Sequence, residues 1–104
     1  MSLNMRLTPQ QTWIITEVVS RHAGDTAEIY LFGSRLIDKA RGGDVDILIE
    51  ADRRLSRIEQ ARIKMELEGA LGLPVDLLFH EKNTEPTPFQ AIALTHATRL
   101  EIRP

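Results

Sequence analysis

Two spacings of apolar residues run along this chain, one typical of helices and one typical of strands. The first helical stretch predicts a helix from Thr8 to about Arg21, with Thr8 as N-cap and Gln11 completing a capping box. Trp13 lies beside the apolar stripe of this helix, and we assign it to packing rather than to base stacking. The stripe expected to face the core consists of Ile14, Ile15, Val18 and Val19.

A second helix is predicted from Ser56 to about Leu71. Ser56 and Glu59 stand at capping-box spacing, and Gly72 follows at the position where a left-handed residue ends a helix. The residues of this helix expected to face the core are Ile58, Ala61, Met65, Leu67 and Leu71.

A third helical start signal follows a polar loop near the C-terminus. Thr87, Pro88 and Gln90 repeat the pattern of the first helix and predict a helix through about Ala97. Its apolar residues suit an interface as well as a core, and they are Phe89, Ile92 and Leu94.

Four stretches rich in branched and aromatic residues predict strands. The second of them ends in the continuously apolar run Ile47-Leu48-Ile49, which predicts a strand covered on both faces and exposed only at its aspartate end. The predicted strands span residues 27–32, 44–49, 75–79 and 100–102.

Composition narrows the class of protein. A chain of 104 residues without repeats or linkers is expected to form a single domain, residues 1–104. A net charge of -2 provides no bulk attraction to nucleic acid, so direct nucleic-acid binding is not expected. The absence of cysteine excludes disulfides and thiolate metal sites. Since the sequence also has no signal peptide and no long apolar run, we expect a cytoplasmic protein that does not span a membrane.

Three aspartates are set inside predicted strands. Asp44 and Asp46 are two residues apart, so their side chains point to the same face of the sheet. Asp76 interrupts an apolar strand, where an ionised carboxylate is costly unless it is paired, metal-bound or at the open end of the sheet. If the strands of Asp46 and Asp76 are neighbours, the three carboxylates converge and suit magnesium better than zinc. The alternative is an ion pair of Asp76 with Arg62 or Lys64.

Gly33 and Ser34 directly follow the first predicted strand. Gly33 permits a tight turn and a close backbone approach, and the Ser34 hydroxyl can cap a following helix, so the pair is a candidate phosphate-binding turn. An ordinary strand-to-helix turn is the alternative interpretation. Further phosphate charge would be neutralised by Arg35, Lys39 or Arg41.

Together these motifs carry a family resemblance. The run Leu31-Phe32-Gly33-Ser34-Arg35, the pair Asp44-Val45-Asp46 and the later Asp76 resemble the signature of the DNA polymerase beta-type nucleotidyltransferase superfamily, in particular its minimal prokaryotic members. The resemblance covers residues 27–80, and its specificity lies in the order and spacing of the motifs. Gly43 stands where many members have a serine.

The resemblance implies a fold, a reaction and a set of residues. The fold is α/β (α+β), similar to the polymerase beta palm, with a small mixed β-sheet flanked by helices. The reaction is transfer of a nucleoside monophosphate, AMP from ATP, with two Mg²⁺ ions held by Asp44, Asp46 and Asp76. The nucleotide- and phosphate-binding residues would be Gly33, Ser34, Arg35, Lys39, Arg41 and Gly43.

The resemblance also implies a partner. Minimal members are similar to antitoxins encoded beside helical HEPN ribonucleases, which they neutralise by binding and, in some cases, by adenylylating a tyrosine. We therefore expect a HEPN-domain toxin as the protein acceptor. Two alternatives stay open: an antitoxin that masks the toxin without catalysis, and a nucleotidyltransferase subunit acting on RNA or a small molecule through a separate acceptor-binding subunit. The sequence does not define the oligomeric state.

Overall fold

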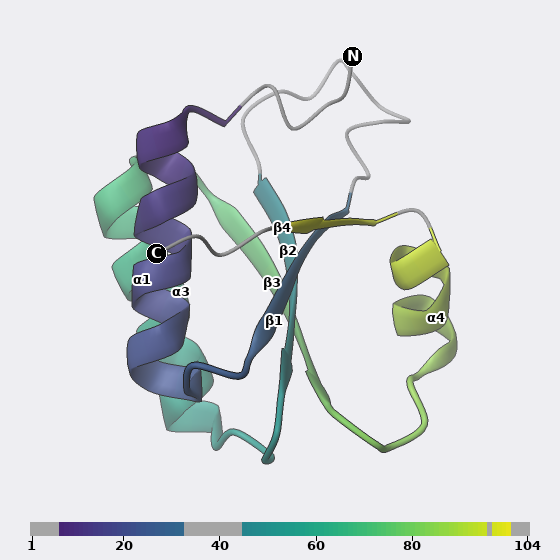
Figure 1. Ribbon diagram of the computed structural model, residues 1–104. Helices are drawn as coiled ribbons and strands as arrows, with labels where there is room; N and C mark the ends of the chain where they lie inside the picture. The colour runs from purple at the N-terminus through teal and green to yellow at the C-terminus, as the bar shows by residue number, and fades with distance from the viewer. Residues whose placement is uncertain (1–6, 33–44, 96, 101–104) are drawn as a thin grey trace.

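The computed structural model describes residues 7–32, 45–95 and 97–100, which form one sheet with helices on both of its faces (Figure 1). The predicted helices and the first three predicted strands are present, with ends that move by a few residues. Of the strand predicted at 100–102, Leu100 ends β4 and the other two residues lie outside the described part of the chain. In chain order the elements are α1 (Pro9–Ala23), β1 (Glu28–Phe32), β2 (Val45–Ala51), α3 (Arg57–Leu71), β3 (Val75–Glu81), α4 (Pro88–Thr95) and β4 (Thr98–Leu100).

The sheet is mixed, as the family resemblance implied. Its strand order is β3-β2-β1-β4, with β1 antiparallel to both β2 and β4 and with β2 parallel to β3. Parallel neighbours need a long crossover, and α3 supplies it between β2 and β3. This crossover places the starts of β2 and β3 side by side.

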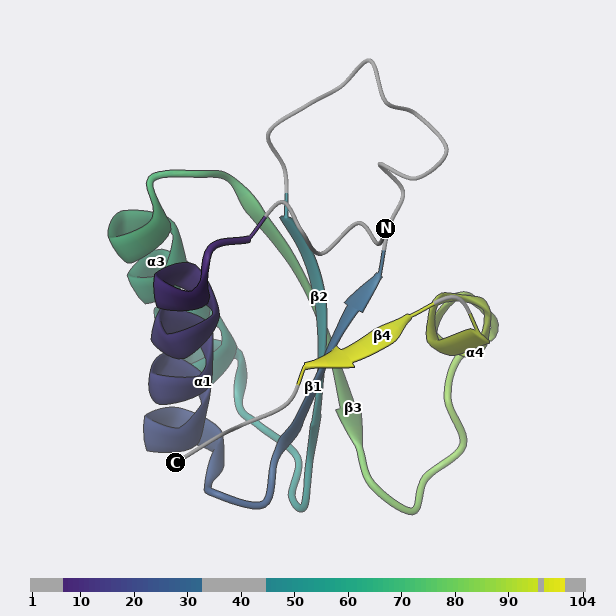
Figure 2. The same cartoon turned by 45° about the horizontal axis from the view of Figure 1, so that its top comes forward.

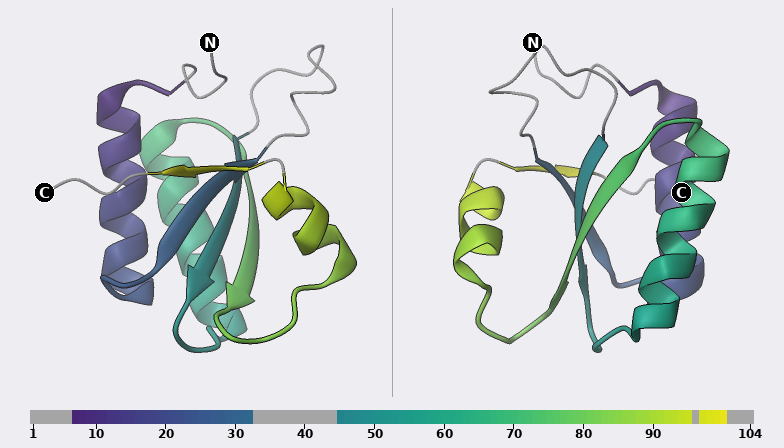
Figure 3. Two further views of the ribbon diagram at one scale, coloured as in Figure 1. Left: turned by 45° about the vertical axis from the view of Figure 1, so that its right-hand side comes forward. Right: turned by 180° about the vertical axis from the view of Figure 1, so that it is seen from behind.

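Two helices cover one face of the sheet and α4 covers the other (Figures 1 and 3). Figure 2 shows α1 and α3 side by side, and the carboxylate of Glu66 on α3 lies 2.8 Å from both Arg21 Nη2 and His22 Nε2 of α1. The prediction that β2 is covered on both faces is confirmed, because Ile47, Leu48 and Ile49 are fully buried. Core residues from the helices are Ile15, Val18, Val19, Ile63 and Leu67.

Capping boxes begin the helices at the predicted positions. The Thr8 hydroxyl accepts a hydrogen bond from Gln11 N, and the Gln11 side chain accepts one from Thr8 N. Thr87 and Gln90 form the same reciprocal pair at the start of α4. These caps satisfy backbone donors that a helix N-terminus leaves without partners.

The capping box of α3 predicts an acid-dependent loss of stability. Glu59 accepts hydrogen bonds from Arg53 and from Ser56 N, and these interactions lower its pKa from 4.5 to about 2. Because the folded-state pKa is depressed, this contribution is present above the unfolded pKa of 4.5 and is lost as the pH falls towards 2. The variant Glu59→Gln keeps an acceptor oxygen for the cap but does not titrate. We therefore expect its urea midpoint to fall less than that of wild type as the pH is lowered from 4.5 towards 2. Urea unfolding of both proteins at several pH values tests this, and parallel curves would contradict it.

The predicted buried face of α3 is wrong at Ile58, Ala61 and Met65 and confirmed at Leu67. In α3 the fully buried residues are Ile63 and Leu67, whereas Ile58 and Met65 are 66% and 71% exposed. Ala61 is exposed as well, and Leu71 is half-buried. The helix carries apolar residues at helical spacing on two faces, and only the docking of α3 on the sheet selects one of them.

Trp13 is also misassigned by the sequence, because it is 59% exposed. Thr16, one helical turn after Trp13, is buried instead, and its hydroxyl donates to the carbonyl oxygen of Trp13 at 2.9 Å. A polar side chain is therefore tolerated in the buried stripe of α1 because the helix backbone satisfies it.

The free edge of β3 is blocked by side chains. Val75 N donates to Glu68 Oε2 at 2.8 Å, and Lys64 Nζ donates to the carbonyl oxygen of Val75. Farther along the strand, Gln90 Nε2 donates to the carbonyl oxygen of Phe79 at 3.0 Å. These bonds occupy backbone groups that would otherwise pair with a strand of another molecule.

We expect Glu68→Ala to open this edge. The variant leaves the Val75 amide without its acceptor, so its melting temperature falls and it self-associates with rising concentration. Glu68→Gln retains an acceptor oxygen and is the matched control. Light scattering across a concentration series measures the difference, and equal behaviour of the two variants would argue against edge protection by Glu68.

Candidate functional site

Two of the three predicted carboxylates lie side by side. In the parallel pairing of β2 with β3, Asp46 is the register partner of Asp76, and in the antiparallel pairing of β1 with β2, Phe32 is the register partner of Asp46. Register partners point to the same face of a sheet, so Phe32, Asp46 and Asp76 form a row across three strands. The fold thus meets the condition set above for carboxylate convergence, namely that these two strands are neighbours.

The two aspartates have different surroundings. Asp46 is 5% exposed, which corrects the expectation that the aspartate end of this strand is open to solvent. Asp76 is exposed, at the beginning of the edge strand. Lys64, one of the two cations considered as a partner for Asp76, bonds the Val75 carbonyl and lies 3.2 Å from Glu68.

The remaining predicted site residues lie outside the described part of the chain, so their predicted roles stay predictions. Within 7–32, 45–95 and 97–100, no group of three or more His, Asp or Glu side chains is arranged to hold a metal ion. A triad would need Asp44 in addition to the described pair. The predicted residues outside the described ranges are Gly33, Ser34, Arg35, Lys39, Arg41, Gly43 and Asp44.

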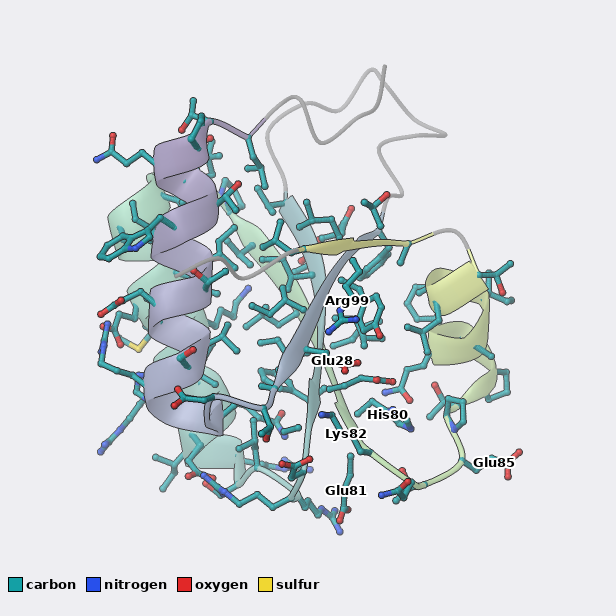
Figure 4. The ribbon with its side chains drawn as sticks, in the orientation of Figure 1. Glu28, His80, Glu81, Lys82, Glu85 and Arg99 are labelled. Atoms are coloured by element: carbon teal, nitrogen blue, oxygen red, sulfur yellow. The ribbon has the colours of Figure 1, made fainter. Side chains whose placement is uncertain are left out.

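Polar groups continue along the same face of the sheet, away from the aspartates. His80 and Glu50 are register partners, and His80 Nδ1 lies 2.9 Å from Glu50 Oε2 while Nε2 lies 2.8 Å from the carbonyl oxygen of Thr84. Figure 4 shows His80, Glu28 and Arg99 on the side of the sheet that faces α4. Both ring nitrogens of His80 have protein partners, which fits a structural role for this side chain.

Tyr30 lies on this face, and its phenolic hydroxyl cannot serve as a base at neutral pH. Burial and a 2.9 Å hydrogen bond from its hydroxyl to Glu28 raise its pKa to about 12. The phenol therefore stays protonated. A base at neutral pH on this face would therefore be a carboxylate rather than Tyr30.

Two surface cavities lie away from the row. One, of about 380 Å³, is lined by residues that include Arg54, His80, Thr84 and Gln90, near the ends of β2 and β3. The other, of about 440 Å³, runs between α3 and β3 and is lined by Arg57, Gln60, Ala61, Lys64, Leu77 and Phe79. Neither contains a residue predicted above to act in the site.

An aromatic pair lies at the β1 end of the row, and the sequence did not predict it. The rings of Phe32 and Phe89 meet edge to face, with centroids 6.4 Å apart and an interplanar angle of 83°. The two residues are far apart in sequence. The sequence feature that pointed to Phe89 was the apolar character of α4, which did not indicate its partner. The packing of α4 on the sheet brings Phe89 to the β1 end of the row.

The comparison with known families fits this geometry. Residues 12–100 match the family model for the nucleotidyltransferase domain. The chain belongs to the nucleotidyltransferase domain family. Membership identifies it as a transferase domain, and the fold agrees with the predicted α/β class.

Solved structures support the same fold. A chain in the structure of a tri-AMPylated Shewanella oneidensis HEPN toxin in complex with MNT antitoxin matches with a TM-score of 0.68 and 24% identity, over 88% of this chain and 70% of that chain. The toxin-antitoxin complex MntA-HepT matches with a TM-score of 0.69 and 22% identity, over 90% and 72% of the two chains. A toxin-antitoxin structure with AMP-PNP gives the same TM-score and identity, over 90% and 73%. Among curated proteins, none matches this nucleotidyltransferase domain.

The described helices of this nucleotidyltransferase domain include none that is long and apolar enough to cross a membrane. The longest, α1 and α3, have 15 residues each. Both have charged residues on their exposed sides, as expected for helices that cover a sheet.

Proposed function

We propose that this nucleotidyltransferase domain transfers AMP from ATP to a protein acceptor in a magnesium-dependent reaction. The proposed acceptor is a HEPN-domain toxin, and the chain is its antitoxin. In this proposal the chain acts as a single domain in the cytoplasm. The observation that carries the proposal is the register of Asp46 with Asp76, inside a chain that matches the nucleotidyltransferase family model. Neighbouring carboxylates at the starts of two parallel strands suit the binding of divalent cations, which would neutralise the negative charge of the phosphoryl group.

The donor set fits magnesium. Asp46 and Asp76 offer carboxylate oxygens on one face of the sheet, and the sequence contains no cysteine that would favour a softer metal. We assign Asp44, Asp46 and Asp76 as the ligands of two Mg²⁺ ions. When bound, such ions neutralise triphosphate charge and lower the pKa of the attacking hydroxyl.

The side chains have distinct roles in the proposed reaction. The acceptor hydroxyl oxygen forms a bond to the α-phosphorus of ATP, and the bond from that phosphorus to the bridging oxygen breaks as pyrophosphate leaves. Asp76 takes the hydroxyl proton, since it is exposed and can release the proton to water. Asp46, held in the row by its two neighbouring strands, is a fixed ligand. The predicted phosphate contacts are Gly33, Ser34, Arg35, Lys39, Arg41 and Gly43.

The partner assignment is supported by the nature of the similar structures. They include an MNT antitoxin with a tri-AMPylated HEPN toxin and a toxin-antitoxin structure with AMP-PNP. Their identities to this chain, 24% and 22%, establish likeness of fold, so donor and acceptor are carried over here as part of the proposal.

The test is a transfer assay. The chain is incubated with ATP labelled at the α-phosphate, MgCl₂ and a HEPN-domain protein from the same genome. We expect label on the HEPN protein, complete dependence on the divalent metal, and no label from ATP labelled at the γ-phosphate. No transfer by the wild-type chain with this partner and metal would reject the proposal.

A second arm separates catalysis from masking. Asp44→Asn with Asp46→Asn removes the charge of two proposed ligands but keeps the size of both side chains. If this variant still neutralises the toxin in cells as well as wild type, the non-catalytic antitoxin is the correct alternative. Transfer to RNA or to a small molecule, but not to the HEPN protein, would support the remaining alternative.

A further inference from the structure

We propose that Phe89 is the surface on which the donor base stacks, so that α4 determines how this domain recognises the nucleoside. The inference rests on the proposed function, because it assumes that a nucleoside triphosphate binds at the aspartate row. Phe89 lies outside the sequence motifs of the proposed site. Its proposed contact is with the planar base, a part of the nucleotide that the aspartates would not contact.

The position of Phe89 is set by the sheet. Phe32 ends β1 and is the register partner of Asp46, and the ring of Phe89 lies against Phe32 with centroids 6.4 Å apart. Phe89 therefore contacts Phe32, the end member of the row that would hold the triphosphate. In a nucleotide, a single ribose separates the base from the α-phosphate, so a base beside the row is within reach of this ring.

The ring is held in place and yet mostly uncovered. It is 60% exposed, although it lies in a turn of helix that is anchored on both sides. Gln90 bonds Thr87 through the cap and donates from Nε2 to the carbonyl oxygen of Phe79, and Ala93 one turn later is buried. A fixed aromatic ring with a free surface binds a planar base at little cost in side-chain entropy.

The two ends of the row differ, and this difference indicates which substrate lies at each end. At the β3 end, Asp76 is exposed on an edge strand, where an incoming acceptor can give up its proton. At the β1 end, the row ends in Phe32, whose ring contacts that of Phe89. In an in-line transfer the acceptor oxygen enters opposite the leaving pyrophosphate, while the nucleoside stays bonded to the α-phosphorus. The aromatic end offers an apolar planar surface for the base, so we place the base there.

The test compares two ligands that share phosphates but differ in the base. Binding of Mg·ATP and of Mg·tripolyphosphate is measured by calorimetry for wild type and for Phe89→Leu, which keeps an apolar contact with Phe32. We expect the variant to bind ATP about tenfold more weakly, as for loss of one base-aromatic stack, and to bind tripolyphosphate unchanged. Phe89→Trp should bind ATP at least as tightly as wild type.

Trp13→Leu is the matched control, since Trp13 is an exposed aromatic residue, 59% exposed, on a helix of the opposite sheet face. It should leave both affinities unchanged. Equal affinity of Phe89→Leu and wild type for ATP, or equal weakening for both ligands, would overturn the inference while leaving the proposed function intact. So would a raised KM for the protein acceptor at unchanged ATP affinity, which would make Phe89 an acceptor contact. A wild-type chain that binds neither ligand would overturn both.

Discussion

Asp46→Asn is expected to lower the rate of nucleotidyl transfer on the order of a thousandfold, because the amide replaces the charge of a proposed magnesium ligand with a neutral group at the centre of the row. The side chain keeps its size and Asp46 is buried, so the change tests charge more than packing. The measurement is single-turnover transfer of α-labelled AMP at saturating ATP and MgCl₂.

The exposed neighbour and a distant aspartate provide the controls. Asp76→Asn, at a solvent-exposed position, should produce a loss of similar size without a change in melting temperature. Asp52→Asn should transfer at the wild-type rate, because Asp52 lies at the other end of β2, where it accepts from Thr26 and lies 3.5 Å from Lys82 Nζ. If Asp46→Asn and Asp52→Asn were equally active, Asp46 would not be a metal ligand.

Ile63→Ala is expected to cost about 2–5 kcal/mol of unfolding free energy, since Ile63 is fully buried between α3 and the sheet. Domains of this size have a total stability of roughly 5–15 kcal/mol, so the loss approaches the margin for folding at physiological temperature. Urea unfolding monitored by circular dichroism measures it.

Ile58→Ala on the same helix is the matched control. Ile58 is 66% exposed, so its truncation should change the unfolding free energy by no more than about 0.5 kcal/mol. The pair discriminates between the two apolar faces of α3. A larger loss for Ile58→Ala than for Ile63→Ala would mean that α3 packs by the face that the sequence favoured.

The elements of the fold were readable from local chemistry. Thr8 and Gln11, Ser56 and Glu59, and Thr87 and Gln90 predicted the helix starts, and reciprocal hydrogen bonds confirm all three. A capping box needs only residues that are three apart, so tertiary contacts do not alter it. The apolar run of β2 likewise predicted a strand covered on both faces.

The orientation of the helices was not readable in this way. Met65 and Trp13 are apolar residues at helical spacing, and yet both face solvent. Hydrophobic periodicity predicts that a helix has a buried face. When a helix has two apolar faces, periodicity does not predict which of the two is buried. The contact of Phe32 with Phe89 is another such case, because nothing local relates the end of β1 to α4.

For this protein, then, the sequence by itself determined the residue types of the proposed nucleotidyltransferase site, since Asp44, Asp46 and Asp76 are recognisable from order and spacing alone. Only the tertiary structure placed Asp46 beside Asp76 and Phe89 beside Phe32. The physical reason is that strand register and helix docking are set by contacts between residues distant in sequence, while motifs and caps depend on near neighbours.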